Sequence, residues 1–263
     1  MAITASDIKK LRDATGISMM ECKKALVETD WDVEKAIEVL RKRGLAKAAK
    51  AADRETSEGG IKILVENDKA FVVAVACETD FVAITPEFNE LLEKMVEVLK
   101  TKGSTEAATD EVEALRTEAV LKMWENLTVK KLEILSGAKF GYYIHSNKKE
   151  AAIAVAKDTG VDEVALKQVA MHITASKPEY LKTTDIPESF VAKETEIAME
   201  QMKNDPKMAN KPEQVLEKIL EGKIAKIKAE ISLLTQDFVI DNTKKVKDFI
   251  GEDTLETFQR ITI

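Results

Sequence analysis

The side chains best suited to nucleophilic or redox chemistry are few in this sequence, starting with two cysteines. Cys22 and Cys77 cannot form a disulfide framework, and neither belongs to a CxxC pair, so a reducing compartment fits them best. Both stand among apolar residues, where burial raises the pKa of a thiol and suppresses its reactivity. We therefore expect both thiols to be inert.

The two histidines, His145 and His172, lie far from both cysteines in the sequence. A zinc site would need scattered ligands, so we expect no metal. His172 lies on an otherwise apolar helix and is expected to be a hydrogen-bonded structural histidine. His145, at the end of a strand, is more open to an interface role. Walker A, GxGxxG, GxSxG and HExxH motifs are absent, so we expect no cofactor and no catalytic residue.

One acidic and aromatic segment, Glu78 to Val82, joins the most apolar run of the chain to a helix that begins at Thr85-Pro86. Such a turn could expose a carboxylate beside a large aromatic side chain. From residue chemistry alone we favour another interpretation, in which Phe81 packs under the helix and Asp80 caps a turn.

The composition indicates which class of protein carries these residues. It has 263 residues, of which 44% are hydrophobic and 33% charged, as in a soluble, helix-rich globular protein. The 40 basic and 47 acidic residues give a net charge of −7, which disfavours direct nucleic-acid binding. The first residues lack the layout of a signal peptide, and the longest apolar run, 70–77, is shorter than the roughly 20 residues a bilayer requires. We expect a cytoplasmic protein without membrane contact.

Three short helices are predicted at the start of the chain, each with apolar residues at i, i+3 and i+4. Thr4 can cap the first, Ser18 with Glu21 forms a capping box for the second, and Asp32 can cap a third that ends before Gly44. Residues 46–60 then indicate a partly helical linker.

Met19 and Met20 open the second of these helices. In one interpretation, one methionine packs inside and the other is incidental. In the other, both belong to a partner-binding patch of flexible, polarizable side chains. Residue chemistry does not choose between the two.

Strand patterns follow the linker. IKILVE and KAFVVAVACE flank Asn67-Asp68 and predict a hairpin. A helix over 86–102, a second helix after GSTEAATD and a strand in LTVKKLEIL complete an α+β unit. Setting Gly60 over Gly141 aligns this hairpin with a second one, which a helix over 162–175 follows.

The remainder of the chain predicts a charged antiparallel helical hairpin, or coiled coil, over 187–229, broken at NDPKMANKP. The tail predicts strands in ISLLTQDFVI and FQRITI with a short helix at 242–250 between them. If these strands close the second α+β unit, the hairpin is an insertion. The predicted fold is α+β, with a three-helix bundle at 1–54, a first core subdomain at 55–140, a second at 141–186 and 229–263, and the hairpin at 187–228.

Three segments resemble the signatures of a known family. They are LRDATGISMMECKKAL (11–26), CETDFVA (77–83) and AMHITASKP (170–178), and they occur in the order and at the spacing of the bacterial translation elongation factor Ts family. The resemblance covers essentially the whole chain. This chain departs from the second signature at Ala76, where the family usually has asparagine, and at Ile84, where it usually has a basic residue.

The resemblance implies a guanine-nucleotide exchange factor that binds elongation factor Tu·GDP and promotes GDP release without making or breaking covalent bonds. It implies that a turn made of Thr79, Asp80, Phe81 and Val82 intrudes near the magnesium and phosphate site of the GTPase. It leaves a homodimer in a 2:2 complex open. The other partner-binding positions that it implies are Arg12, Met19, Met20, Lys23, His145, Phe238 and Val239.

Two other classes of function stay open from the residues. The runner-up is a non-catalytic adaptor whose bundle, of ubiquitin-associated type, binds a partner without any effect on nucleotide release. An enzyme comes third, because the sequence lacks nucleophile, metal and phosphate motifs.

Overall fold

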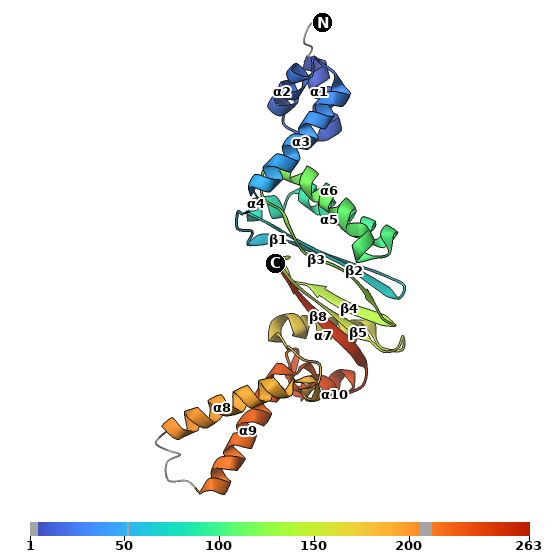
Figure 1. Cartoon of the computed structure of the whole chain (residues 1–263). Helices are drawn as coiled ribbons and strands as arrows, with labels where there is room; N and C mark the ends of the chain where they lie inside the picture. Colours follow the sequence, from blue (N-terminus) through green and yellow to red (C-terminus); the bar gives the residue numbers. More distant parts are fainter. Residues whose placement is uncertain (1–4, 52, 206–211) are drawn as a thin grey trace. The chain divides into compact units, whose positions relative to one another are not determined.

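The computed structural model of the chain describes residues 5–51, 53–205 and 212–263 (Figure 1). They form helices and small antiparallel sheets, so the predicted α+β class is confirmed. The helix cap predicted at Thr4 and most of the predicted break in the helical hairpin, residues 206–211, lie outside the described residues. Within the described ranges, no helix combines the length and the apolarity that crossing a membrane requires.

The chain divides into two compact units. The first contains Met1–Ser136, Ser146–Glu150 and Ile261–Ile263. The second contains Gly137–His145 and Ala151–Arg260. The finer division into four segments stays a prediction.

The first unit begins with three helices, α1 (Ala5–Thr15), α2 (Met19–Glu28) and α3 (Val33–Ala51). Ser18 caps α2 by accepting a hydrogen bond from the backbone N–H of Glu21 at 3.4 Å, which is one half of the predicted capping box. The carboxylate of Glu21 accepts from Lys24 and Arg43 instead. The helices enclose a small apolar core because each has one apolar stripe. Its buried members are Ile8, Leu11, Ile17, Cys22, Ala25, Leu26, Ala36, Leu40 and Leu121.

Gly44 does not end the third helix, and this part of the prediction is wrong. A Cβ atom at Gly44 would lie 2.3 Å from Cδ1 of Leu121, which belongs to α6 (Thr105–Met123). The glycine therefore allows close packing of α3 on α6, and α3 continues into the first part of the predicted linker, as far as Ala51. The rest of that linker ends in strand β1 (Glu58–Glu66).

The predicted hairpin is present as β1 and β2 (Lys69–Cys77), joined by Asn67 and Asp68, and β3 (Thr128–Ser136) extends the sheet in the order β1-β2-β3. Between β2 and β3 the chain forms α4 (Asp80–Ala83), α5 (Pro86–Lys102) and α6. Helix α6 begins earlier than predicted because Ser104 caps it. Helices α5 and α6 lie on one face of the sheet (Figure 1), where Phe71, Val73 and Val75 pack with Phe88, Met95 and Leu99.

The second unit repeats the hairpin in β4 (Lys139–Ile144) and β5 (Glu150–Ala156), with β8 (Leu255–Thr262) beside β5. The glycines that align in the repeat each lie under a helix. A Cβ atom at Gly60 would lie 3.1 Å from the Phe88 ring on α5, and one at Gly141 would lie 2.3 Å from the backbone of Leu166 on α7 (Glu163–Ser176). In both units, therefore, a glycine allows a helix to cross its sheet at close distance.

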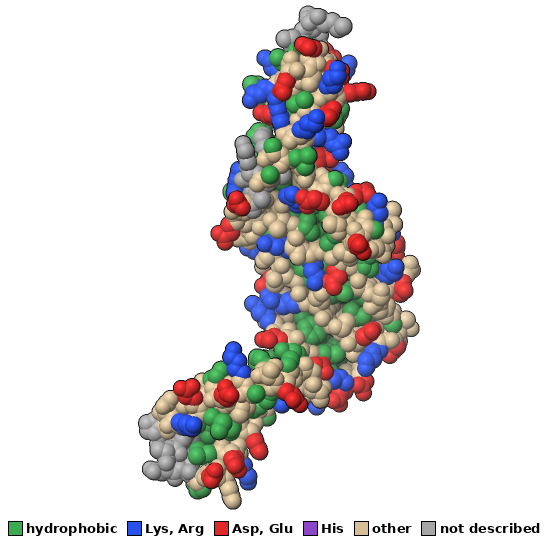
Figure 2. All heavy atoms as spheres, viewed as in Figure 1, with side chains coloured by type: hydrophobic (Ala, Val, Ile, Leu, Met, Phe, Trp, Pro, Cys, Tyr) green, Lys and Arg blue, Asp and Glu red, His purple; other side chains and the backbone are tan. Residues whose placement is uncertain are grey.

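The helical hairpin consists of α8 (Glu188–Asn204) and α9 (Glu213–Ile231), which run side by side (Figure 1). The short 3-10 helix η1 (Thr183–Asp185) precedes it. Along the described part of the two helices the buried seam is narrow and contains Ala198 and Met202. Acidic and basic side chains mix over the face of the hairpin shown in Figure 2.

The predicted tail is partly wrong. Residues 231–240 are not one strand: α9 ends at Ile231, a 3-10 helix η2 (Leu233–Thr235) follows, and β6 covers Asp237–Phe238 alone. The apolar side chains of this run pack into the core although most of its backbone is not a strand. The sequence pattern alone does not distinguish such a segment from a buried strand. The predicted helix at 242–250 is β7 (Asp241–Lys245) followed by α10 (Val246–Ile250). The last predicted strand is present as β8.

Candidate functional site

The acidic and aromatic segment forms the short helix α4, and its aromatic side chain is exposed. Phe81 keeps 76% of its surface accessible, so the interpretation that it packs under the next helix is wrong. Asp80 is not the cap either, because the hydroxyl of Thr79 accepts the hydrogen bond from the backbone N–H of Val82 at 3.4 Å. Ile84, which follows α4, is also exposed. The segment thus presents two large apolar side chains and the Asp80 carboxylate on one short turn.

The residue that begins this turn, Thr79, is held by the loop after α6. One carboxylate oxygen of Glu125, Oε2, accepts hydrogen bonds from the backbone N–H groups of Glu78 and Thr79, both at 3.0 Å. The other oxygen, Oε1, accepts one from the hydroxyl of Thr79. In return, Oε1 of Glu78 accepts a hydrogen bond from the backbone N–H of Asn126 at 2.6 Å. An exposed aromatic side chain therefore follows a firmly bonded backbone.

Neither cysteine offers a nucleophile. Burial, together with the nearby Glu125 carboxylate, raises the pKa of Cys77 to about 12, and its Sγ lies 3.2 Å from the carbonyl oxygen of Thr79. Burial also raises the pKa of Cys22, whose Sγ lies 3.5 Å from the carbonyl oxygen of Ile17. Among the described residues, no group of three or more His, Cys, Asp or Glu side chains could hold a metal ion.

A second cluster of predicted residues lies on the bundle. Met19, Met20, Lys23 and Arg12 are all exposed, so the interpretation that one methionine packs inside is wrong. Met20 and Lys23 line a shallow depression of about 410 Å³ on the surface of α2 and α3. The other residues that line it are Lys24, Val27, Glu28 and Arg43.

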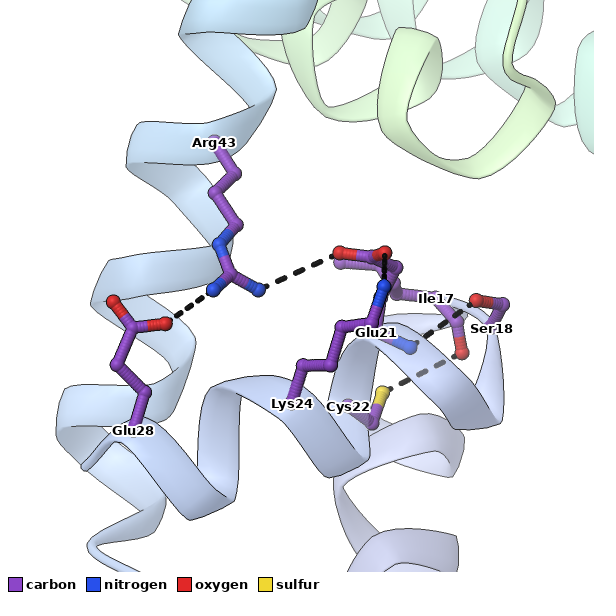
Figure 3. Close-up of polar contacts among 7 residues, drawn as sticks. All are labelled: Ile17, Ser18, Glu21, Cys22, Lys24, Glu28 and Arg43. Atoms are coloured by element: carbon purple, nitrogen blue, oxygen red, sulfur yellow. Dashed lines mark hydrogen bonds and ion pairs between the residues drawn. The ribbon is translucent and has the colours of Figure 1, made fainter. Parts of the chain in front are cut away.

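Arg43 fixes α2 against α3 beside this depression (Figure 3). Its guanidinium donates hydrogen bonds to two carboxylates of α2, Glu21 at 3.4 Å and Glu28. Glu21 also accepts one from Lys24 at 3.3 Å. Because these charged groups are partly exposed, their ion pairs contribute little to stability. We assign them a role in orienting α2 against α3.

The remaining predicted contact positions, His145, Phe238 and Val239, belong to the second unit. His145 is exposed, and its Nδ1 lies 3.1 Å from the hydroxyl of Tyr143. Phe238 is buried and stacks on Phe249 with 4.4 Å between ring centroids, so its side chain supports the surface and does not form it. Val239, the next residue, is 52% exposed. The predicted contact at this segment therefore depends on Val239.

Comparison with known proteins decides the family. Residues 78–263 match the family described as Elongation factor TS. Elongation factor Ts of Vibrio vulnificus (strain YJ016) is 40% identical over an alignment of 266 positions that covers 100% of this chain and 92% of that protein. The chain belongs to the elongation factor Ts family. Elongation factor Ts of Pasteurella multocida (strain Pm70) is 41% identical over 95% of this chain and 87% of its own length, and that of Spiroplasma citri is 36% identical over 99% and 92%.

The second family signature, CETDFVA, therefore covers the end of β2 and all of α4, and the structure adds residues to it that sequence reasoning missed. Glu125 and Asn126 bond its backbone, and Arg54 pairs with Glu78 at 3.1 Å. The only sequence signal for Glu125 was an acidic residue in the loop between a helix and a strand, which is too common to select it. Arg43 on the bundle was missed for a similar reason, since it lies among other basic residues of α3.

Proposed function

We propose that this chain accelerates GDP release from elongation factor Tu by placing α4 beside the magnesium and phosphate site of that GTPase. Membership of the elongation factor Ts family implies the exchange-factor role in translation elongation and elongation factor Tu as the partner. The observation that carries the α4 mechanism is the exposure of Phe81 on a turn whose first residue, Thr79, is fully hydrogen-bonded. Asp80 and Val82 complete the intruding turn.

The energetic scale supports a large role for Phe81. An exchange factor accelerates release only as far as it stabilises the displaced arrangement, at about 1.4 kcal/mol for each tenfold. Burying one aromatic side chain contributes roughly 1.5–3 kcal/mol, and Phe81 has this contribution still to gain because it is exposed in the free protein. One side chain of this kind supplies much of a thousandfold effect but not all of it. Reciprocity then requires GDP to weaken the complex by the same factor.

The remaining contacts hold the two proteins together. We propose that Met19, Met20, Lys23 and Arg12 of the bundle grip the GTPase. Apolar side chains beside cations on a rigid helix suit a protein surface of mixed apolar and acidic character. In the second unit, His145 and Val239, with Phe238 beneath it, form a further contact.

The organisation of the chain is part of the same proposal. The bundle at 1–54, of ubiquitin-associated type, would bind the partner, and the coiled-coil hairpin at 187–228 would be an insertion between the two parts of the second subdomain. We propose that the protein acts in the cytoplasm without direct contact to nucleic acid or membrane. A homodimer in a 2:2 complex is a further hypothesis.

The decisive experiment measures the release of a fluorescent GDP analogue from elongation factor Tu with and without this protein. We expect strong acceleration that saturates with the concentration of the chain. A protein that binds elongation factor Tu and leaves the release rate unchanged would instead be the adaptor, which the exposed methionine patch would also serve.

A further inference from the structure

We infer that Glu125 is a positioning residue for nucleotide exchange: its carboxylate clamps the backbone of Glu78 and Thr79 and so fixes the direction in which Phe81 projects. This inference rests on the proposed function, and it assigns a part of that function to a loop 46 residues away along the chain.

Every polar group of Thr79 has a hydrogen-bond partner. Its N–H and its hydroxyl donate to Glu125, and its carbonyl oxygen accepts from the backbone N–H of Ala83 at 3.3 Å and lies 3.2 Å from the thiol of Cys77. A residue bonded at all of these atoms cannot rotate about its backbone without breaking several hydrogen bonds at once. Phe81 follows it by two residues inside a single short helix.

The clamp is reciprocal. While Glu125 accepts from the N–H of Glu78, the carboxylate of Glu78 accepts from the N–H of Asn126. Asn126 is buried, and its side-chain Nδ2 donates to the carbonyl oxygen of Arg54 at 2.8 Å. The guanidinium of Arg54 in turn donates to Glu78 at 3.1 Å. Two loops and the segment after α3 thus meet at one closed set of hydrogen bonds.

Trp124, the residue before Glu125, has a backbone conformation that surrounding contacts must hold in place. Trp124 ends α6 in the left-handed conformation, with φ +63° and ψ 15°, and its N–H donates to the carbonyl oxygen of Val120. Residues with a Cβ atom adopt this conformation at an energetic cost and keep it where surrounding contacts hold it. The turn at Trp124 directs the chain from the helix into the loop that carries Glu125.

A carboxylate fits this position because three donors converge on it and it has only acceptors to offer. Glutamine keeps the length and one acceptor oxygen, which can still receive the two backbone N–H groups, while its NH2 can donate to the Thr79 hydroxyl. Alanine leaves all three donors without this partner. The two substitutions therefore separate the geometry of the clamp from its charge.

The test compares Glu125→Ala and Glu125→Gln in the full-length chain, with elongation factor Tu carrying a fluorescent GDP analogue. We expect Glu125→Ala to lower the maximal stimulated release rate by up to about tenfold to a hundredfold, the loss expected when the Phe81 contact itself is removed. The half-saturating concentration should change much less, because the bundle supplies most of the grip. Glu125→Gln should recover most of the rate. The control is Asp185→Ala, which removes a similar carboxylate-to-backbone bond, to Lys182 N at 2.8 Å, in the second unit and should leave the rate unchanged.

A double substitution asks whether Glu125 acts through Phe81. If it does, Glu125→Ala should add little to Phe81→Ala, because the side chain that the clamp positions is already missing. Equal slowing by Glu125→Ala in both backgrounds would overturn the inference. If Phe81→Ala alone leaves release unchanged, the proposed function fails, and the clamp is then judged by a measurement that needs no partner.

That measurement is amide hydrogen exchange in the free protein. Loss of the clamp should speed the exchange of the Glu78 and Thr79 amides in Glu125→Ala, with the amides of α5 unchanged as a check on folding. Unchanged protection at both positions would show that Glu125 does not hold the turn. Should the alanine variant fail to fold, Glu125→Gln is used in both measurements. We then expect it to keep both the amide protection and the release rate. Loss of the release rate with the amide protection intact would also overturn the inference.

Discussion

The backbone N–H of Val239 donates a hydrogen bond to Nδ1 of His172, with 3.1 Å between the two nitrogens. The other ring nitrogen of His172, Nε2, lies 2.9 Å from Oε1 of Gln236. These two partners require a neutral imidazole with its proton on Nε2. The exposed Val239 is therefore held in place by a buried histidine, which confirms the expectation of a hydrogen-bonded structural role for His172.

This relationship predicts a pH dependence of stability. Burial lowers the pKa of His172 from its usual 6.5 in spite of the hydrogen bond to Gln236, so the folded state binds its proton less readily than the unfolded state. The stabilisation is fully present above about pH 6.5 and is lost as the pH falls through the lowered value. We expect the free energy of unfolding, measured with denaturant, to decline between pH 7.5 and 5.5 more in the parent protein than in His172→Gln. Equal declines in the two proteins would contradict this assignment.

A second prediction concerns the thiol of Cys77. Because its pKa is raised to about 12, it is protonated at neutral pH and should resist alkylation by iodoacetamide at pH 8 in the folded protein. Denaturant should release full reactivity. We expect Glu125→Gln to lower the pKa of Cys77, since the Glu125 carboxylate contributes to raising it. Rapid labelling of Cys77 in the folded parent protein would show that the turn at Thr79 is open.

Gly44 and Gly222 form a matched pair of helix glycines with opposite expected effects. Alanine should stabilise a helix interior by about 0.5–1 kcal/mol relative to glycine. At Gly222 on α9 a new Cβ would meet nothing within 4 Å, so Gly222→Ala should give this gain. At Gly44 it would collide with the buried Leu121, and overpacking of about 1–3 kcal/mol should make Gly44→Ala destabilising. Stabilisation by Gly44→Ala in thermal unfolding would show that α3 does not pack closely on α6.

The methionine patch leads to a prediction about affinity. Met20 is 63% exposed, so Met20→Ala should change the stability of the chain by no more than about 0.5 kcal/mol. If the bundle grips elongation factor Tu, the same substitution should weaken binding by about 1 kcal/mol or more in calorimetry. Val33→Ala, at another exposed position on the bundle, is the control. Equal affinities of the parent and Met20→Ala would remove Met20 from the contact.

The comparison of sequence and structure shows where local reasoning is sufficient. The first hairpin and the helix at 86–102 were predictable because their signals are local. Asn67-Asp68 lies between the two apolar strands of the hairpin, and the helix begins after Thr85 and ends before Gly103. Gly44 was misjudged because the reason for a glycine there is Leu121, 77 positions away in the numbering. A helix that packs on another needs space that its own sequence does not reveal.

From residue chemistry alone, the exposure of Phe81 could not be predicted, for a related reason. An aromatic side chain after an apolar strand ordinarily packs into the core. Here the turn is held by Glu125, 46 residues away, and so Phe81 does not need to pack under α5 to fix the turn. The family signature indicated a functional turn, but the long-range hydrogen bonds that hold it could not be derived from the seven residues of that signature.

The most direct test of the account is the stimulated release of a fluorescent GDP analogue from elongation factor Tu by Phe81→Ala. Because Phe81 is exposed in the free protein, its removal should leave the free energy of unfolding within about 0.5 kcal/mol of the parent value. Val164→Ala removes apolar surface at a position on α7 that is 61% exposed and should leave release unchanged. On the scale of roughly 1.5–3 kcal/mol for one buried aromatic, we predict that Phe81→Ala slows stimulated release by about one to two orders of magnitude. An unchanged release rate from a folded Phe81→Ala protein would contradict the central claim that this side chain enters the GTPase.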